Sequence, residues 1–350
     1  MKIAQVSSLM EAVPPKLYGG TERVVAYLTD ELVALGHDVT LFASGDSHTT
    51  ANLEPGWPRA LRLDTKMRDY LAPHIILLET LARRARDFDI IHLHIDYLAY
   101  PLMRRLGVPF LTTLHGRLDL PELPWIYDAF ADVPVVSISD SQREPLPEAN
   151  YVGTVYHGLP QQLLMPGSGE GGYLAFIGRI SPEKAPDAAI RIAGAAGMKL
   201  KIAAKVDPVD QAYFEQQIEP SLSLPHVEFI GEIDESRKGA FLGNAAGLLF
   251  PIAWREPFGL AMIEAMACGT PVIAMRRGSV PEVIEQGVTG FIVDTEEEAI
   301  AAVRRLPELD RNQVRRRFEA RFTARRMAKD YLRLYERLIR ARRPVQLEVA

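Results

Sequence analysis

Short apolar runs alternate with longer helical patterns along almost the whole chain. Residues 2–6 form a run typical of a strand, and residues 20–35 carry a single apolar stripe typical of a helix, which Gly36 ends. Further strands are predicted at 39–43, 90–94, 110–113, 135–139, 173–177, 200–204, 227–230, 248–251, 272–274 and 291–293, and further helices at 299–306 and 323–343. Strands that alternate with helices predict βαβ units, in which helices cover both faces of parallel sheets.

This alternation is interrupted near the middle of the chain. Residues 159–172 are rich in proline and glycine, which is typical of a linker. The chain has 350 residues, which is more than one typical compact domain. We therefore predict two doubly wound α/β domains with a cleft between them, the first at 1–160 and the second at 173–322, joined by a linker at 161–172.

The composition argues against several classes of protein. A net charge of -5 disfavours a dedicated nucleic-acid binder, which is more often basic. Cys268 is the single cysteine in the sequence, so a disulfide framework and a cysteine-built zinc site are excluded. No apolar run approaches the roughly 18 residues of a membrane-spanning helix, and residues 1–13 lack the apolar stretch of a signal peptide. We expect a soluble, cytoplasmic protein.

The carboxyl ends of the predicted strands are the places where a doubly wound sheet binds its ligands. Gly19 and Gly20 precede a helix, where backbone N–H groups can approach an anion, although a flexible turn explains them equally well. His115 follows the strand at 110–113 and is either a ligand contact or a structural histidine. His92 and His94 lie on one face of the strand at 90–94 and Asp96 follows it, in a group that fits a polar wall of the cleft better than a metal site.

Two cations follow the first strand of the second half. Arg179 and Lys184 flank Ser181 and Pro182, a pair that predicts the start of a helix. Two cations at a helix N-terminus form a site for a diphosphate that needs no metal ion. The alternative interpretation is that both are solvated surface charges.

Two glutamates follow a later strand of the second half. Glu256 lies in the loop after the strand, and Glu264 is expected about two turns along a helix that Pro257 opens. A carboxylate in an otherwise apolar helix needs a partner that offsets its desolvation. Hydroxyl groups of a sugar or ribose would serve as that partner, and a buried arginine or a backbone amide is the alternative.

One acidic pair is set aside as a metal site. Asp87 and Asp89 form a D-x-D pattern, which holds a divalent metal in many enzymes that use sugar nucleotides. Here the pattern precedes a strand, at the edge of the sheet opposite the expected ligand site. We therefore interpret it as the end of a helix and the lead into a strand.

Taken in order, these segments resemble the retaining glycosyltransferases of family GT4, which have the GT-B fold. The resemblance covers nearly the whole chain and rests on the ordered set of motifs, since each motif alone is weak. In the first half the motifs are Gly19-Gly20-Thr21-Glu22, Gly36-His37-Asp38-Val39, Asp89-Ile90-Ile91-His92 and Leu114-His115-Gly116. In the second half they are Gly178-Arg179-Ile180-Ser181-Pro182-Glu183-Lys184, Glu256 with Glu264, Ala265-Met266-Ala267-Cys268-Gly269-Thr270-Pro271-Val272, Pro281-Glu282-Val283 and Gly287-Val288-Thr289-Gly290. Ala185 departs from the pattern, because the family usually has glycine after the lysine.

The resemblance implies a fold and a set of site residues. The fold is two Rossmann-like domains that face a central cleft, with residues 323–350 as a helix that returns to the first domain. The implied catalytic residues are His115, which lines the sugar site, Arg179 and Lys184, which bind the donor diphosphate, and Glu256, which holds hydroxyls of the transferred sugar. Donor binding is assigned to Gly19, Gly20, Gly178, Phe258, Gly259, Leu260 and Glu264, the last of which takes the ribose. The acceptor side is assigned to Glu22, His94 and Asp96.

The resemblance also implies a reaction. A hexose is expected to pass from a nucleoside-diphospho-sugar, UDP-glucose first and GDP-mannose next, to a hydroxyl group of a small-molecule, glycan or lipid-linked acceptor. We expect retention of anomeric configuration, no metal, no cofactor besides the donor as co-substrate, and no nucleic-acid partner. The alternatives are a nucleotide-sugar epimerase or phosphorylase on the same fold and a non-catalytic nucleotide-sugar-binding protein. The basic residues between Arg304 and Arg343 leave peripheral contact with the inner face of a membrane as a further alternative.

Overall fold

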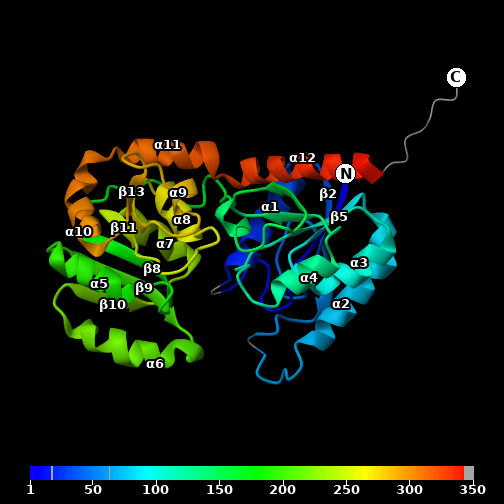
Figure 1. Cartoon of the computed structure of the whole chain (residues 1–350), viewed down its shortest axis with the longest axis horizontal. Helices are drawn as coiled ribbons and strands as arrows, with labels where there is room; N and C mark the ends of the chain where they lie inside the picture. The colour runs from blue at the N-terminus through cyan, green and yellow to red at the C-terminus, as the bar shows by residue number, and fades with distance from the viewer. Residues whose placement is uncertain (17–18, 63, 343–350) are drawn as a thin grey trace. The chain divides into compact units, whose positions relative to one another are not determined.

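The computed structural model describes residues 1–16, 19–62 and 64–342 and divides them into two compact units. Unit 1 consists of Met1–Ile138, Arg143–Gly158 and the described residues from Ala324 to Arg342, and the rest of the helix predicted at 323–350 lies outside the described residues. Unit 2 consists of Leu159–Thr323 together with the short segment Ser139–Gln142. Each unit has its own parallel sheet, with helices along the strands (Figure 1).

The sheet of unit 1 has seven strands in the order β3-β2-β1-β4-β5-β6-β7, and every pair of neighbours is parallel. The strands are β1 (Lys2–Val6), β2 (Asp38–Ser44), β3 (Asn52–Trp57), β4 (Ile90–Leu93), β5 (Phe110–Thr113), β6 (Val135–Ser137) and β7 (Tyr151–Thr154). The central strands are buried along their whole length, which explains why they are continuous apolar runs in the sequence.

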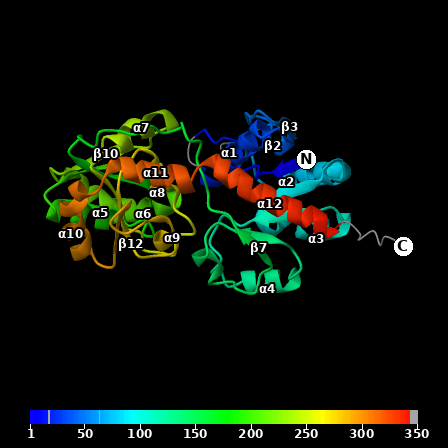
Figure 2. The ribbon, with the colours of Figure 1, turned by 90° about the horizontal axis from the view of Figure 1, so that it is seen from above.

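The helices of unit 1 come from both ends of the chain. Those in the first part are α1 (Gly20–Ala34), α2 (Leu71–Arg84), α3 (Tyr100–Leu106) and α4 (Leu123–Ala129), with short 3₁₀ turns at η1 (Ala85–Asp87), η2 (Asp96–Ala99) and η3 (Ser141–Arg143). The long α12 (Ala324–Arg342) packs against α1, and Figure 2 shows it in red across this unit. Tyr331 and Tyr335 of α12 are buried in the interior of unit 1.

The sheet of unit 2 has six parallel strands in the order β10-β9-β8-β11-β12-β13. They are β8 (Tyr173–Ile180), β9 (Lys199–Val206), β10 (Val227–Gly231), β11 (Gly247–Phe250), β12 (Val272–Met275) and β13 (Gly290–Val293). The helices are α5 (Pro186–Ala195), α6 (Gln211–Tyr213), α7 (Glu235–Gly243), α8 (Leu260–Ala267), α9 (Val280–Val283), α10 (Glu296–Arg305) and α11 (Arg311–Arg321). A π-turn and 3₁₀ turns lie at η4 (Pro208–Asp210), η5 (Phe214–Ile218), η6 (Glu219–Ser223) and η7 (Leu306–Glu308). Because the right-handed crossovers run in opposite directions from β8 and from β11, α5 and α8 cover opposite faces.

Each strand predicted from the sequence is present, but two strands were not predicted. β3 contains Pro55 and Gly56 and is mostly accessible to solvent, so its sequence lacks the pattern of a buried strand. β7 is short and only half-buried. Both lie at the edges of the unit 1 sheet, where proline and glycine are tolerated and the apolar signal is weak.

Two predicted helix starts are wrong by several residues. Residues 181–184 form a turn, and α5 begins at Pro186 because Ala185 takes a left-handed conformation with φ 49 that no helix can contain. This conformation explains why glycine suits the position after the lysine in the related family. Pro257 lies in a loop, and α8 begins at Leu260 after Gly259, whose φ is 82. Glu264 is therefore about one turn into its helix rather than two.

None of the helices in the described part of the chain is both long enough and apolar enough to cross a membrane.

Candidate functional site

Each sheet has a point at which the strand order reverses, and ligands of doubly wound folds bind there, beyond the carboxyl ends of the strands. In unit 2 this point lies between β8 and β11, so the loops after Ile180 and Phe250 flank it. In unit 1 it lies between β1 and β4, next to the residues that follow Val6 and Leu93. Most of the candidate residues from the sequence lie in or near the loops at these two points.

Arg179 is the next-to-last residue of β8 in unit 2. Its Nη2 lies 2.9 Å from Oε2 of Glu183, and its Nε lies 3.2 Å from Oδ2 of Asp210. Arg179 is thus a partly buried cation that two carboxylates hold at the carboxyl end of the strand. The predicted helix at Ser181 is absent, so Arg179 owes its place to β8 rather than to a helix N-terminus.

Lys184 and Glu256, which are 72 positions apart in sequence, meet beside this switch point. Nζ of Lys184 lies 2.5 Å from Oε2 of Glu256, and both side chains are largely buried. The indole N–H of Trp254 donates to the same oxygen at 2.8 Å. Nζ also lies 5.5 Å from the centre of the Trp254 ring and 5.9 Å from that of Phe250, at cation–π range. The sequence predicted Lys184 and Glu256 as separate ligand contacts, and the structure pairs them.

The backbone around Glu256 is tied to the loops that follow two other strands. Ser279 N–H donates to the carbonyl oxygen of Glu256 at 3.0 Å, and Ala253 N–H donates to that of Glu183 at 2.8 Å. Gly278 passes so close that a Cβ atom there would lie 2.3 Å from the Glu256 carbonyl oxygen. The loops after β8, β11 and β12 are therefore fixed together, which holds the Lys184–Glu256 pair in place.

The N-terminus of α8 follows directly after this loop. Phe258 is buried and its carbonyl oxygen accepts a hydrogen bond from Ser279 Oγ at 2.8 Å. Gly259 turns the chain into Leu260, the first residue of the helix. In the described part of the chain no side chain caps this helix, and Met262 N–H donates to the Gly259 carbonyl oxygen at 3.0 Å, so the first two N–H groups of the helix are left for an anion or a hydroxyl group.

Glu264 is buried on α8 and has a protein partner that the sequence analysis missed. Its Oε1 lies 2.6 Å from Nζ of Lys238 on α7, and the two side chains are only 7% and 12% exposed. Lys238 also lies 3.5 Å from Glu235. The expected alternative partners were an arginine or a backbone amide, whereas the structure supplies a lysine. The polar composition of α7 gave no signal for it, because a lysine on such a helix usually faces solvent.

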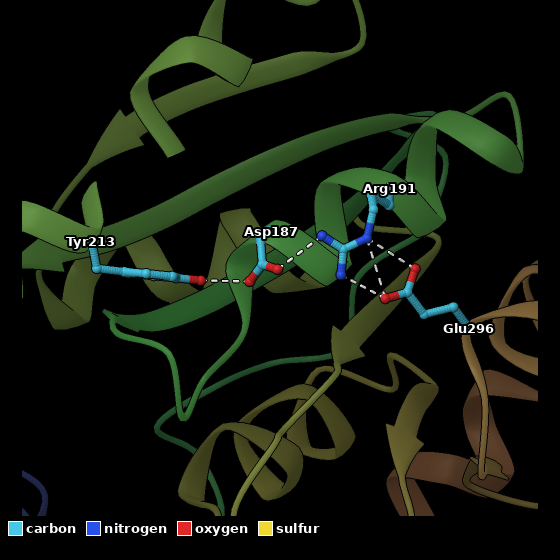
Figure 3. Close-up of polar contacts among 4 residues, drawn as sticks. All are labelled: Asp187, Arg191, Tyr213 and Glu296. Carbon is cyan, nitrogen blue, oxygen red and sulfur yellow. Dashed lines mark hydrogen bonds and ion pairs between the residues drawn. The ribbon is translucent and has the colours of Figure 1, made fainter. Parts of the chain in front are cut away.

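The segment that carries Asp210 is braced by a surface network (Figure 3). Oη of Tyr213 donates to Asp187 at 2.5 Å, and Arg191 joins Asp187 at 2.8 Å to Glu296 at 2.6 Å. Burial disfavours the Asp187 carboxylate, but the hydrogen bonds from Tyr213 and Arg191 outweigh it, so the pKa of Asp187 lies below its usual value. The network links α5 to α6 and α10, and it thereby supports the position of Asp210 beside Arg179.

A short segment that follows β6 also contributes to unit 2. Asp140 N–H and Ser141 N–H donate to the two carboxylate oxygens of Glu282 at 2.8 and 2.7 Å. Ser139 Oγ donates to the carbonyl oxygen of Pro257 at 2.6 Å. These contacts anchor residues 139–142 next to the Glu256–Gly259 loop, and they give Glu282 of the Pro281-Glu282-Val283 motif a structural role.

In unit 1, His94 and His115 follow neighbouring strands and contact each other. Nδ1 of His94 lies 2.8 Å from Nε2 of His115, and the rings of His115 and His157 stack with centres 5.3 Å apart. Burial lowers the pKa of His115 to about 3 and holds the pKa of His94 and of His157 well below the usual value. The rings are therefore neutral near pH 7 and act as hydrogen-bonding groups.

The other candidates of unit 1 lie in different local settings. Gly19 and Gly20 lie at the start of α1, as predicted, and Glu22 is buried in its first turn, where desolvation raises the pKa of its carboxyl. Asp96 is exposed at the start of η2 and takes a left-handed φ of 48. Asp89 caps the N-terminal edge of the sheet by accepting from Lys2 N–H at 2.7 Å.

The described residues contain no group of three or more histidine, cysteine, aspartate or glutamate side chains arranged to hold a metal ion. His92, which lies two positions before His94 in the sequence, bonds to Tyr335 and Thr113.

The candidate residues from the sequence are divided between the two units. Those in unit 1 are His94, His115, Glu22, Asp96, Gly19 and Gly20, and those in unit 2 are Gly178, Arg179, Lys184, Glu256, Phe258, Gly259, Leu260 and Glu264.

Comparison with known proteins covers both units. Residues 18–144 match the family described as Glycosyltransferase Family 4, and residues 167–325 match Glycosyl transferases group 1. A D-inositol 3-phosphate glycosyltransferase of Saccharomonospora viridis is 31% identical over 252 residues, which are 67% of this chain and 57% of that protein. A probable sucrose-phosphate synthase of Thermosipho melanesiensis is 31% identical over 148 residues, 40% of this chain and 35% of that protein. The chain thus spans a little over half of the first relative and about a third of the second.

Solved structures agree on the fold. The sucrose-phosphate synthase of Thermosynechococcus elongatus superposes with a TM-score of 0.80 at 20% identity, covering 97% of this chain and 99% of that one. Anabaena HepE, solved in complex with UDP and glucose, gives 0.74 at 16% identity and covers 96% of this chain and 100% of that one. Two parallel Rossmann-like sheets, the reversal points that carry the candidate residues and the two matched families lead to one conclusion: this chain belongs to the GT4-type glycosyltransferases with the GT-B fold.

Proposed function

We propose that this protein transfers a hexose, with retention of anomeric configuration and without a metal ion, from a nucleoside-diphospho-sugar to a hydroxyl acceptor. The observation that carries the proposal is the Lys184–Glu256 pair beside Arg179 at the switch point of unit 2. One cation and one carboxylate, 2.5 Å apart, suit a ligand in which a phosphate adjoins a polyol. A nucleotide sugar has this arrangement at its sugar–phosphate bond.

The proposed chemistry follows from where charge develops. Breaking the bond between the anomeric carbon and the phosphate builds negative charge on the leaving diphosphate. Arg179, Lys184 and the N-terminus of α8 supply fixed positive charge and N–H groups to stabilise it, which replaces the role of a metal ion. Glu256 then holds hydroxyls of the transferred sugar, and Glu264 accepts from the ribose. In unit 1, His115 lines the sugar site, with Glu22, His94 and Asp96 on the acceptor side.

The donor base is proposed by analogy. HepE is described in complex with UDP, with UDP and glucose, and with UDP-glucose, which supports UDP-glucose as the first donor to test. GDP-mannose is the second. The acceptor class, whether small molecule, glycan or lipid-linked, is left to an acceptor screen.

Calorimetric titration with UDP, GDP and ADP in EDTA tests the donor site. We expect one nucleotide to bind, and Arg179→Ala and Lys184→Ala each to weaken it by about tenfold or more, as expected for a charged hydrogen bond. Arg305→Ala is the matched control, because Arg305 is an exposed arginine of the same unit that pairs with Glu308. Binding that requires a divalent metal, or that neither substitution weakens, would contradict the proposal.

The alternatives differ in what the donor becomes. Sugar release that depends on free phosphate indicates a phosphorylase, and interconversion of the nucleotide sugar without release indicates an epimerase. Binding without turnover in any acceptor screen indicates a non-catalytic binder.

Three arginines of α11 have partners within the protein, which argues against a role in membrane contact. Arg315 donates to the carbonyl oxygens of Leu164 and Ala267, and Arg317 and Arg321 pair with Glu285. We propose a cytoplasmic location.

A further inference from the structure

A continuous chain of hydrogen bonds, buried from His94 onward, joins His115 to the last helix of unit 1. Nε2 of His115 contacts Nδ1 of His94 at 2.8 Å, and Nε2 of His94 contacts Oε1 of Gln5 at 2.8 Å. Gln5 Nε2 donates to Oη of Tyr335 on α12 at 3.1 Å. Residues 5, 94, 115 and 335 therefore form one path, although they are far apart in the sequence.

The path continues beyond Tyr335 to a second tyrosine of α12. Oη of Tyr335 lies 2.6 Å from Nδ1 of His92, and Nε2 of His92 lies 2.7 Å from Oγ1 of Thr113. Oγ1 of Thr113 lies 2.8 Å from Oη of Tyr331. All of these groups are buried, so each lost hydrogen bond leaves an uncompensated polar atom.

The chemical groups on this path determine which atom donates and which accepts in each hydrogen bond. The carbonyl oxygen of the Gln5 amide can only accept, so His94 carries its proton on Nε2 and accepts at Nδ1. His115 must then donate from Nε2, which leaves Nδ1 as a lone pair. In the described part of the chain, this Nδ1 atom is buried and has no hydrogen-bond partner.

The reverse direction costs more in the free protein. Rotating the Gln5 amide by half a turn would move every proton along the path and put a proton on Nδ1 of His115. That N–H group would be a buried donor without a partner, and orphaned buried N–H groups are rarer than orphaned acceptors. Because the Tyr335 hydroxyl can accept or donate, it satisfies the Gln5 amide in either orientation, and the orphaned N–H group at His115 is what disfavours the reverse one.

We propose that Gln5 and Tyr335 are positioning residues, which fix the His115 ring in the Nε2–H tautomer and so present its Nδ1 lone pair as an acceptor for a hydroxyl group of the transferred sugar. The part concerning the sugar rests on the proposed function, whereas the part concerning the tautomer does not. Tyr335 lies 220 positions from His115 in the sequence and influences its tautomer through hydrogen bonds inside unit 1. In this way α12 affects the hydrogen-bonding groups of the proposed sugar site. The low pKa values of His94 and His115 agree with this role, because a protonated ring could not accept.

Nitrogen NMR of the protein labelled with ¹⁵N-histidine tests the tautomer directly. The chain has 8 histidines, and the His115 signals are assigned from their loss in His115→Gln. We expect the wild type to carry the His115 proton on Nε2. Tyr335→Phe leaves the Gln5 amide N–H group without its acceptor in the wild-type orientation, so both amide orientations become populated and the two ring nitrogens of His115 should shift toward averaged values.

Tyr331→Phe is the matched control for this experiment. It removes a buried tyrosine hydroxyl one turn away on the same helix, at the far end of the path beyond Thr113. We expect its His115 signals to remain those of the wild type. If Tyr335→Phe folds and leaves the His115 signals unchanged, or if Tyr331→Phe shifts them equally, the positioning role is wrong.

Kinetics then test the part that depends on the proposed function. Once a donor is known, Tyr335→Phe should lower kcat about fivefold, the effect of one hydrogen bond, with an unchanged Kd for the nucleoside diphosphate. Gln5→Leu should have the same effect and Tyr331→Phe none. A changed tautomer with unchanged kcat would refute the role at the sugar, and a chain that binds no nucleotide would refute the proposed function while leaving the tautomer result in place.

Discussion

At the scale of residues, the Lys238–Glu264 pair places two opposite charges in the interior of unit 2. Lys238 lies on α7 and Glu264 on the apolar α8, 2.6 Å apart. Removing one member of a buried pair leaves an uncompensated charge, which is costly, whereas removing both together restores most of the loss.

We therefore expect Lys238→Met to lower the free energy of unfolding by about 3 kcal/mol, Glu264→Gln to have an effect of similar size, and the double variant to be more stable than either single one. Urea unfolding of the three variants measures this. The control is Lys201→Met, which breaks the more exposed Lys201–Glu228 pair and should cost about 1 kcal/mol or less. Additive effects in the double variant would show that the two residues are not coupled.

The sequence could name candidate residues for the site, but it could not show the contacts between them. Arg179, Lys184 and Glu256 were chosen as candidates because they follow strand ends, and strands are recognisable from local pattern. The Lys184–Glu256 contact depends on β8 and β11 being neighbours, which is a property of strand order. Likewise, Lys238 becomes a partner of Glu264 only when α7 packs on α8.

At the scale of elements, unit 2 holds its irregular 207–223 segment in place by side-chain contacts. Tyr213 is the only member of the network in Figure 3 that comes from this segment. The backbone here passes through 3₁₀, α and π turns, which contain few regular hydrogen bonds to stabilise it. The Tyr213–Asp187 bond is thus a main link between the segment and α5.

Tyr213→Phe removes this bond and keeps the ring, so we expect faster hydrogen exchange in the amides of 207–218 without a change in β8 or β9. Exchange followed by mass spectrometry after digestion resolves these peptides. A loss of about 1 kcal/mol from one hydrogen bond corresponds to about fivefold faster exchange. Equal acceleration throughout unit 2 would indicate global destabilisation and contradict a local role.

The accuracy of the sequence prediction differs between strands and helix starts. Buried strands and the amphipathic α1 were predicted nearly to the residue, because burial imposes the pattern. The starts of α5 and α8 were misplaced, since each is set by one left-handed residue, Ala185 or Gly259. The sequence indicated these starts through Pro182, with Ser181 before it, and through Pro257, and the φ angles of the residues that follow decided otherwise.

At the scale of the whole molecule, the buried histidines make the two units respond differently to acid. His92, His94, His115 and His157 all belong to unit 1, and burial holds the pKa of each below its usual value, for His115 at about 3. The unfolded chain therefore takes up protons first as the pH falls below about 6.5. This stabilisation is complete above that pH and is lost progressively below it.

We expect the four histidines to lower the stability of unit 1 by about 1 kcal/mol each, about 4 kcal/mol together, between pH 6.5 and pH 5.5, and Asp96, whose pKa is raised to about 6, to offset a small part of this loss. Tryptophan fluorescence separates the units: Trp254→Phe leaves Trp57 and Trp125 as reporters of unit 1, and the double variant Trp57→Phe/Trp125→Phe leaves Trp254 as the reporter of unit 2. His157→Gln should reduce the pH dependence of unit 1 by about a quarter. Equal pH dependence in both units would contradict this assignment.

The path of the chain also sets the order in which the units can be completed. Unit 2 is almost contiguous, and its two ends meet, since Leu159 N–H donates to the carbonyl oxygen of Phe322 at 2.9 Å. Unit 1, in contrast, needs α12, which follows unit 2 in the sequence. During synthesis on a ribosome, the strands of unit 1 therefore emerge well before Tyr331 and Tyr335, because the second Rossmann-like domain is made between them. The domain that begins first is finished last, and until then its histidine-rich interior lacks the two tyrosines that bond to it.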